Sequence, residues 1–245
     1  MTIKTYLRTV YILLKKELRA YFSSPIAYIF LAVFLVAGSW LFFNDFFLRG
    51  EATMKTYFTY LPWIFLFLAP AITMRLWAEE KKMGTNEFLL TLPITDWQAV
   101  LSKFFGALIF VGLALVLTLP LTSTVSGLGD LDPGPVWGAY IGAMFLAGSY
   151  LSLGLFVSSL TKNQIIAFVL GLGACFLFFV IGAGFVLNQA PASIAPLMKY
   201  LGLGSHFESI ARGVIDSKDI VYYLSFIFFF LWLNVRVIER RELRY

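Results

Sequence analysis

The stretch MRLWAEEKKMGTNEFLLTLPITDWQAVLSK, residues 74–103, lies between two long apolar runs and is strongly hydrated. Its eight charged side chains and two amides are Arg75, Glu79, Glu80, Lys81, Lys82, Glu87, Asp96 and Lys103, with Asn86 and Gln98. Charged side chains at this density are too costly to place in the hydrocarbon core of a bilayer. We therefore predict that residues 74–103 form an aqueous loop between two membrane-spanning helices.

Within this loop the order of residues predicts a short helix. Gly84 favours a break, and Thr85 is suited to cap a new helix. Residues 87–90 then form a helical turn that Pro93 stops, and Asp96 is expected to cap the next helix. The short helix would expose three apolar side chains between charged flanks, Phe88, Leu89 and Leu90. Such a helix is suited to dock into another protein, although an ordinary loop between spans remains the alternative.

The ordered motifs of this region resemble those of the coupling helix of an ABC transporter permease. The residues that carry the resemblance are Leu61-Pro62-Trp63, residues 70–75, 79–82 and 84–90, Leu92-Pro93, Val100 and Lys103-Phe104. More closely, the chain resembles an ABC type-2 export permease of the gliding-motility-associated (GldF-like) subfamily. The resemblance covers most of the chain and implies two permease domains working with two ATPase subunits.

The resemblance also implies roles for individual residues of the loop. An ATPase that closes on ATP would pull the helix over residues 84–90 and tilt the attached spans. Glu80 and Glu87 would then make polar contacts with the ATPase, and Phe88 and Leu89 would fill its groove. Gly84, Thr85 and Leu90 complete the expected coupling set. Each of these side chains has an alternative, in which it is solvated or packs against the permease's own helices.

Composition places the chain among membrane proteins. Of its 245 residues 60% are hydrophobic and only 13% are charged, whereas about a quarter of a soluble domain is charged. The net charge of +5 does not indicate nucleic-acid binding, because the basic residues flank apolar runs instead of gathering on one soluble module. The lone cysteine, Cys175, excludes an intrachain disulfide and is interpreted as packing.

The first 25 residues predict an amphipathic elbow helix. Over residues 5–22 the apolar side chains Leu7, Val10, Tyr11, Leu14, Leu18 and Tyr21 recur at helical spacing. Arg8, Lys15, Lys16 and Arg19 occupy much of the remaining surface, as in a helix that lies on an anionic membrane. Ser23-Ser24-Pro25 then turns the chain into the bilayer. A secretory signal peptide is the alternative, but the basic region and the apolar run are both too long for one.

Six apolar runs predict six membrane-spanning helices in a single 1–245 permease domain, an all-α polytopic fold. The runs cover residues 26–44, 56–74, 104–129, 133–161, 163 to about 187, and 220–235. Most contain at least nineteen uncharged residues, and a span needs roughly twenty. Their continuous apolar character favours helices over the alternating strands of a barrel.

The distribution of basic residues predicts the orientation. With the N-terminus inside, the inner segments hold fourteen of the nineteen Lys and Arg residues and the outer segments hold five. This positive-inside bias places both termini and residues 74–103 in the cytoplasm of a bacterial inner-membrane protein.

The outer segment, residues 188–219, predicts a short helix before the last span. Ser205 and Glu208 have the spacing of a capping box. Phe207, Ile210, Ala211, Val214 and Ile215 then recur at three and four residues and form one apolar stripe. We expect this helix to lie in the outer interface, where similar permeases close the transport pathway. A plain surface loop is the alternative.

The sequence contains no pattern for catalysis, cofactor binding or metal binding. No phosphate-binding loop GxxxxGK[ST] occurs, so we expect ATP to be bound and hydrolysed by a partner subunit. His206 is the only histidine, which excludes a zinc-ligand spacing, and no intramembrane carboxylate is available to orient it for a Ser205–His206 nucleophile pair. The glycines at 171, 173, 182 and 184 are interpreted as sites of close helix packing.

The apolar runs hold no ionisable side chain, which argues against a proton- or sodium-driven carrier. Energy must then enter through a cytoplasmic partner, in agreement with an exporter driven by a separate ATPase. Because six helices are few for a closed path, we expect a second copy or a related permease chain as a partner, in contact with membrane lipid. A non-transporting anchor or scaffold of an envelope machine is the alternative function. The sequence leaves the substrate open.

Overall fold

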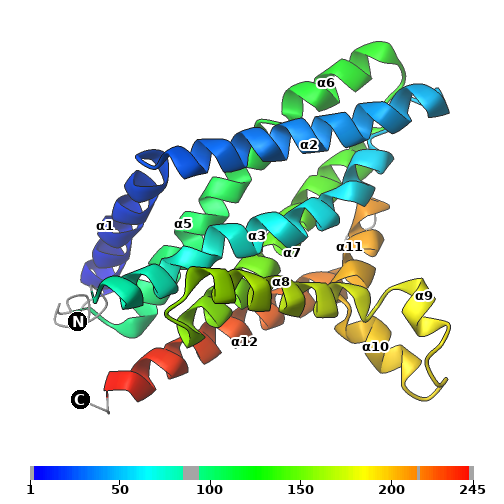
Figure 1. Ribbon diagram of the computed structural model, residues 1–245. Coiled ribbons are helices and arrows are strands. Elements are labelled where there is room, and N and C mark those ends of the chain that lie inside the picture. The colour runs from blue at the N-terminus through cyan, green and yellow to red at the C-terminus, as the bar shows by residue number, and fades with distance from the viewer. Residues whose placement is uncertain (1–2, 85–93, 214–215, 243–245) are drawn as a thin grey trace.

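The protein is all-helical in the residues that its structure, a computed structural model, describes: 3–84, 94–213 and 216–242. In chain order its helices are α1 (Ile3–Phe22), α2 (Pro25–Arg49), α3 (Lys55–Met83), α5 (Asp96–Val116), α6 (Leu119–Leu128), α7 (Pro133–Leu160), α8 (Gln164–Val180), α9 (Gly184–Leu187), α10 (Ala195–Leu201), α11 (Leu203–Ala211) and α12 (Ser217–Glu242). The long helices form an elongated bundle, and the short helices α9, α10 and α11 gather toward one end of it (Figure 1). The predicted all-α class is confirmed.

Five helical segments of the described chain are long and apolar enough to cross a membrane: Pro25–Leu48, Lys55–Met83, Asp96–Leu128, Pro133–Leu160 and Ser217–Arg240. The sixth expected span corresponds to α8, which has 17 residues and is apolar. At 1.5 Å per residue α8 is about 25 Å long, somewhat short of a hydrocarbon core of about 30 Å. The prediction of a sixth span therefore stays a prediction.

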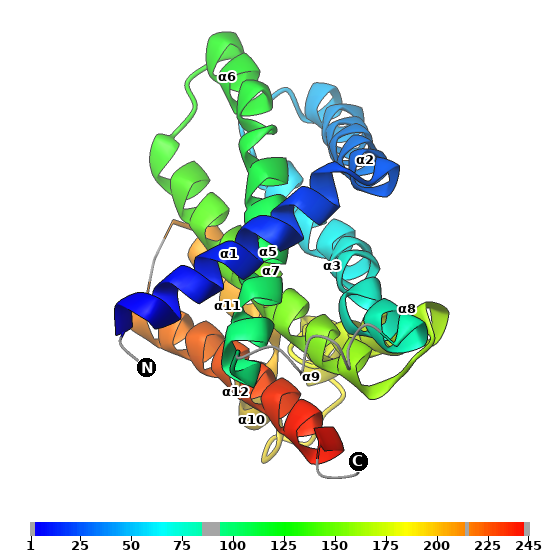
Figure 2. The same cartoon turned by 90° about the vertical axis from the view of Figure 1, so that its left-hand side faces the viewer.

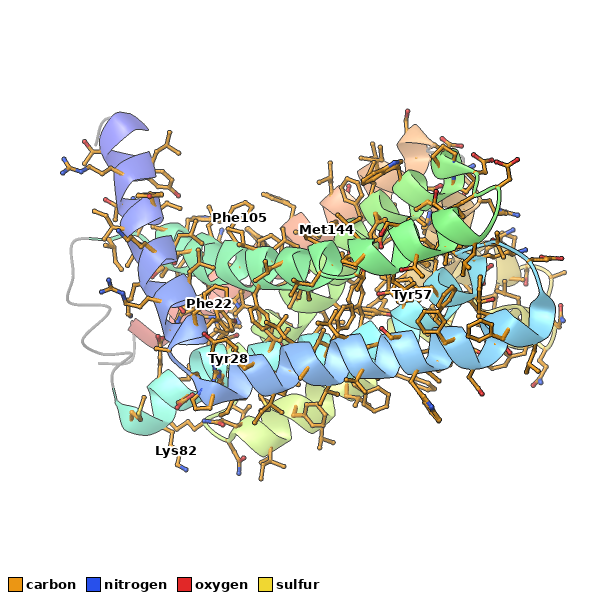
Figure 3. All side chains as sticks on the ribbon, turned by 90° about the horizontal axis from the view of Figure 1, so that it is seen from above. Phe22, Tyr28, Tyr57, Lys82, Phe105 and Met144 are labelled. Carbon is orange, nitrogen blue, oxygen red and sulfur yellow. The ribbon has the colours of Figure 1, made fainter. Side chains whose placement is uncertain are left out.

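α1 is confirmed as a helix, and it lies crosswise to the bundle at the end where the chain enters α2 (Figure 2, Figure 3). The turn predicted at Ser23-Ser24-Pro25 is present. α1 ends at Phe22, Ser24 is the residue before α2, and Pro25 is the first residue of α2. Proline is favoured there because the first amide of a helix needs no intrahelical acceptor.

Much of the predicted aqueous loop is helical in the part that the structure describes, namely residues 74–83 and 96–103. α3 continues through the charged residues to Met83, so that residues 74–83 are helical. Gly84 ends α3 with a φ of 71°, as predicted from its freedom to adopt the left-handed conformation. The charged residues extend the helix past the apolar run because Glu and Lys are themselves good helix formers.

α5 begins at Asp96, but the prediction that Asp96 caps it is wrong. Thr95 is the cap, and it forms a capping box with Gln98. The backbone N–H of Gln98 donates to Thr95 Oγ1 at 3.4 Å, and the backbone N–H of Thr95 donates to Gln98 Oε1 at 2.9 Å. The pattern Thr-x-x-Gln satisfies two helix-end donors at once, which leaves Asp96 to complement the helix dipole in the first turn.

α7 lies at the centre of the bundle and packs closely against α3. A β-carbon at Gly154 would collide with the Thr73 side chain, so only glycine permits this approach. One turn further along α7, the Ser158 hydroxyl accepts hydrogen bonds from the N–H groups of Trp77 and Ala78, both at 3.2 Å, and donates to the Met74 carbonyl at 3.0 Å. α3 is therefore fixed to α7 close to the start of its charged segment.

The third and fifth apolar runs are divided differently from the prediction. α5 ends at Val116 and α6 resumes at Leu119, because Pro120 lies at the start of a new helix. α8 ends at Val180, not near Leu187. A β-carbon on Gly182 would lie 2.8 Å from the Gly202 Cα, so the chain turns here to let two backbone segments meet. Of the glycines predicted to pack, Gly171 and Gly182 do so, whereas Gly173 and Gly184 face open space.

Candidate functional site

The candidate site is a buried charge cluster where α1, α3 and α5 meet. Lys103, in the second turn of α5, is 2% exposed. Its Nζ donates to Glu80 Oε1 on α3 at 2.6 Å and to Glu17 Oε1 on α1 at 3.2 Å. It also lies 5.0 Å from the centroid of the Trp77 ring, a cation–π distance. One ammonium thus holds three helices together.

The sequence of each helix explains how these groups come together. Glu17 lies on the buried face of α1, three residues after Leu14 and four before Tyr21. Gly106 on α5 lets α1 approach, because a β-carbon there would lie 3.1 Å from Glu17 Cβ. Tyr21 stacks on Phe110 of α5, with ring centroids 5.1 Å apart. The apolar contacts of α1 therefore place a carboxylate directly beside α5.

The charged end of α3 is also bound to α7. Lys81 is 9% exposed, and its Nζ donates to the Ser159 carbonyl near the end of α7. The last carbonyls of a helix carry partial negative charge, so a lysine at this position is favourable. Together with Ser158, this contact joins residues 74–83 to the central helix of the bundle.

At the opposite end of the bundle, His206 of α11 joins α10 and α12. Its Nδ1 lies 2.6 Å from Asp219 Oδ1 in the first turn of α12, and its Nε2 lies 2.8 Å from the Tyr200 carbonyl oxygen. The imidazole also stacks on Tyr222, with a centroid distance of 4.0 Å. The Tyr200 carbonyl can only accept, so Nε2 donates to it, and Nδ1 and the Asp219 carboxyl group hydrogen-bond to each other.

The sequence matches the family described as "ABC-2 family transporter protein" over residues 11–238, which is nearly the whole chain. The chain belongs to this ABC-2 transporter family. None of the curated proteins searched matches it. The ABC-2 permease is therefore a multi-pass transmembrane subunit of a transporter. Members of its family generally pair with an ABC ATPase.

In this ABC-2 permease, the predicted coupling residues fall in two groups. Glu80 and Gly84 lie at the end of α3, and Glu80 already binds Lys103 within the permease. Thr85, Glu87, Phe88, Leu89 and Leu90 lie outside the described residues. Their contacts with an ATPase stay predictions. The described segments nevertheless show that both helices leading to residues 85–93 are joined by one ion-pair cluster.

The predictions for the outer helix need correction. Ser205 is not the cap of α11, since the helix begins at Leu203 and Gly202 precedes it. The Ser205 hydroxyl instead hydrogen-bonds to the carbonyls of Lys199 and Gly202, at 2.6 and 2.8 Å. The helix starts earlier because fully buried Leu203 anchors its first turn. The expected partner Glu208 is exposed and does not complete a capping box.

Two residues of the predicted apolar stripe pack against α7. Phe207 and Ile210 are buried, and a β-carbon on Gly142 of α7 would lie 2.9 Å from Ile210 Cγ2. Val214 and Ile215 lie outside the described residues. The carboxylate that contacts His206 is that of Asp219, in the first turn of α12 and at the end of the predicted outer segment. The Ser205 hydroxyl hydrogen-bonds to backbone carbonyls, so the role of Ser205 and His206 in this geometry is to connect helices.

Sequence reasoning missed Glu17 and the role of Lys103 in the permease. One signal was present: Glu17 follows the helical spacing of the apolar residues Leu14 and Tyr21, so it lies on the buried face of an otherwise basic helix. A carboxylate on a buried face requires a cation nearby. The sequence alone does not show which cation, since Lys103 is 86 residues away.

Proposed function

We propose that this ABC-2 permease is the membrane subunit of an ATP-driven exporter and couples to a separate ATPase through residues 84–90. The observation that carries the proposal is the Glu17–Lys103–Glu80 cluster at the base of that segment. A force applied between Gly84 and Thr95 would act on α3 and α5 directly and on α1 through Lys103. A docking helix attached to such a base would move three helices as one unit.

The arrangement of the ends supports a cytoplasmic position for the coupling segment. The start of α1, the end of α12, the end of α3 and the start of α5 all lie at one end of the bundle (Figure 1). That end carries most of the basic residues that the positive-inside rule assigns to the cytoplasm. We accordingly propose a bacterial inner-membrane location, with a second permease copy or related chain completing the pathway. The GldF-like subfamily is part of the same proposal.

The proposal is tested by purifying the tagged permease from its native membrane and identifying the ATP-binding subunit that accompanies it. The variant Phe88→Asp/Leu89→Asp is expected to lose that subunit. A matched control, Leu128→Asp/Leu197→Asp, places the same two charges on exposed leucines of α6 and α10, far from the coupling segment, and should retain it. Equal retention by both variants would refute coupling through residues 84–90.

Transport is tested on the complex in proteoliposomes. An exporter should show ATP hydrolysis that depends on the permease and is reduced by the Phe88→Asp/Leu89→Asp variant. An ATPase subunit that binds the permease but hydrolyses ATP at the same rate without it would instead support a scaffold function.

A further inference from the structure

A cavity of about 200 Å³ opens between α1, α3 and α5, beside the elbow turn. We name it the elbow cavity. Its polar lining consists of Glu17, Tyr21, Arg75, Glu79, Glu80 and Lys103. At about 30 Å³ per water molecule, it has room for roughly seven waters, which is the size of a small charged headgroup.

Two donors of the elbow cavity have unused hydrogen-bonding capacity. The Tyr21 side chain is 4% exposed, and its hydroxyl is buried with no hydrogen-bond partner. Burial raises the pKa of this hydroxyl, so it stays protonated and acts as a donor. Arg75 makes one long hydrogen bond, from Nη1 to Ser24 Oγ at 3.4 Å, and lies 5.8 Å from the centroid of the Tyr21 ring. Its other N–H groups remain available to an anion.

Three carboxylates line the cavity, those of Glu17, Glu79 and Glu80. Glu17 and Glu80 share the single charge of Lys103, and Glu79 lines the cavity with no ion pair to another described residue. A ligand that complements this lining therefore needs an anionic group for Arg75 and Tyr21 and a cationic group for Glu79. An anion alone would leave the Glu79 carboxylate without a partner.

The position of the cavity indicates a lipid. Ala20 and Tyr21 line it near the end of α1, and Arg75 in its lining hydrogen-bonds to Ser24 in the turn that leads into the apolar span α2. α1 itself lies across the end of the bundle (Figure 3). Phe22 and Tyr28 lie together at this turn, where the Tyr28 hydroxyl donates to the Phe22 carbonyl at 3.0 Å. Ile26, Tyr28 and Ile29 are each about half exposed on the neighbouring surface of α2, where acyl chains would lie.

We propose that the elbow cavity binds the headgroup of a zwitterionic aminophospholipid such as phosphatidylethanolamine, with its phosphate on Arg75 and Tyr21 and its ammonium on Glu79. A primary ammonium donates hydrogen bonds to a carboxylate, whereas the trimethylammonium of phosphatidylcholine has no N–H. The site lies between the elbow helix and the two helices that flank residues 85–93. The lipid would therefore brace the base of the coupling segment. The proposal goes beyond ATPase coupling and does not depend on it.

Binding is measured on the purified, delipidated permease in detergent. Short-chain phosphatidylethanolamine, phosphatidylcholine and phosphatidylglycerol are titrated separately, and the thermal unfolding midpoint or the bound lipid in native mass spectra is recorded. We expect phosphatidylethanolamine to bind roughly tenfold more tightly than the other two, because only it makes charge-assisted hydrogen bonds to both sides of the cavity. Inorganic phosphate together with ethanolamine is the probe for a headgroup without acyl chains.

Three variants separate the parts of the site. Arg75→Gln should weaken the binding of every phospholipid roughly tenfold. Tyr21→Phe, which keeps the ring in place, should weaken binding by a smaller factor. Glu79→Gln should abolish the preference for phosphatidylethanolamine over phosphatidylcholine. The matched control is Lys82→Gln, which removes an exposed charge of α3 that does not line the cavity.

The outcomes decide between sources of the ligand. Equal binding of phosphatidylethanolamine and phosphatidylcholine by the wild-type chain, or a preference unchanged in Glu79→Gln, would overturn the proposal. Stabilisation by inorganic phosphate alone that equals that of the lipid would show a simple anion site and would also overturn it. Because the assay contains no ATPase, failure here leaves the coupling proposal standing, and loss of the ATPase in pull-downs leaves the lipid proposal standing.

Discussion

Replacing Lys103 by methionine tests whether charge compensation holds α1, α3 and α5 together. Methionine keeps most of the apolar stem but leaves Glu17 and Glu80 without their shared cation. Breaking a buried ion pair by removing one partner costs about 3–5 kcal/mol, because the remaining charge is left uncompensated. The two carboxylate side chains are 11% and 17% exposed, so some water reaches them. We therefore expect Lys103→Met to lower the free energy of unfolding by about 3 kcal/mol, near the lower limit of this range.

A charge-neutral variant supplies the critical comparison. In Glu17→Gln/Glu80→Gln/Lys103→Met the three charges of the cluster are removed together, and replacing a buried ion cluster by neutral residues of similar size is often nearly neutral. We expect this triple variant to recover about 2 kcal/mol of the loss. Lys82→Met, which removes an exposed charge at the same end of α3, should change stability by no more than about 0.5 kcal/mol.

The assay is thermal unfolding of the purified permease in one detergent, followed by circular dichroism. For a chain of this length, the thermal unfolding midpoint falls by roughly 2–4 °C for each kcal/mol of lost stability. Lys103→Met should therefore unfold about 6–12 °C below the wild type. A triple variant as unstable as the single variant would refute the argument. It would show that Lys103 stabilises the junction through packing on Trp77 and not through its charge.

Three further predictions use the same melting assay. Gly154→Ala should destabilise the α3–α7 contact by about 1–3 kcal/mol through overpacking, whereas Gly173→Ala, which faces open space on α8, should be neutral or slightly stabilising; similar effects would contradict the close-packing assignment. Thr95→Ala should cost about 1 kcal/mol by removing the cap of α5, and no loss would mean that the capping box is not needed. His206→Ala should cost about 3–5 kcal/mol because it leaves the buried Asp219 carboxylate without its partner, while Asp219→Asn, whose amide donates to Nδ1, should cost much less. The reverse order would mean that His206 does not compensate a buried carboxylate.

Periodicity and composition predicted the features of the fold that depend on local sequence. The apolar run at 133–161 corresponds to α7 within one residue, and the turn at Ser23-Ser24-Pro25 and the break at Gly84 are present. These features follow from apolar length, from the fixed φ of proline and from the left-handed freedom of glycine.

The features that sequence reasoning missed depend on contacts between distant residues. Residues 74–83 were assigned to a loop because charge was equated with solvent exposure, yet Lys81 is buried against the end of α7. The burial of Lys103, which the sequence places in the predicted loop, depends on two carboxylates that come from other helices. Ser205 was assigned as a cap because the spacing to Glu208 fitted, but long-range packing of Leu203 set where the helix begins.

The hydrogen bonds between α3 and Ser158 divide that helix into two parts, or arms, of unequal length. From Trp77 to Gly84 the short arm spans about 10 Å, and from Trp77 back to Lys55 the long arm spans about 33 Å, at 1.5 Å per residue. The segment of α3 from Thr73 to Lys81 is held against α7, so a pull at Gly84 acts on this held segment and reaches the long arm through it. Pro62 and Pro70 both lie in the long arm, so it is there that bending would absorb part of the stroke.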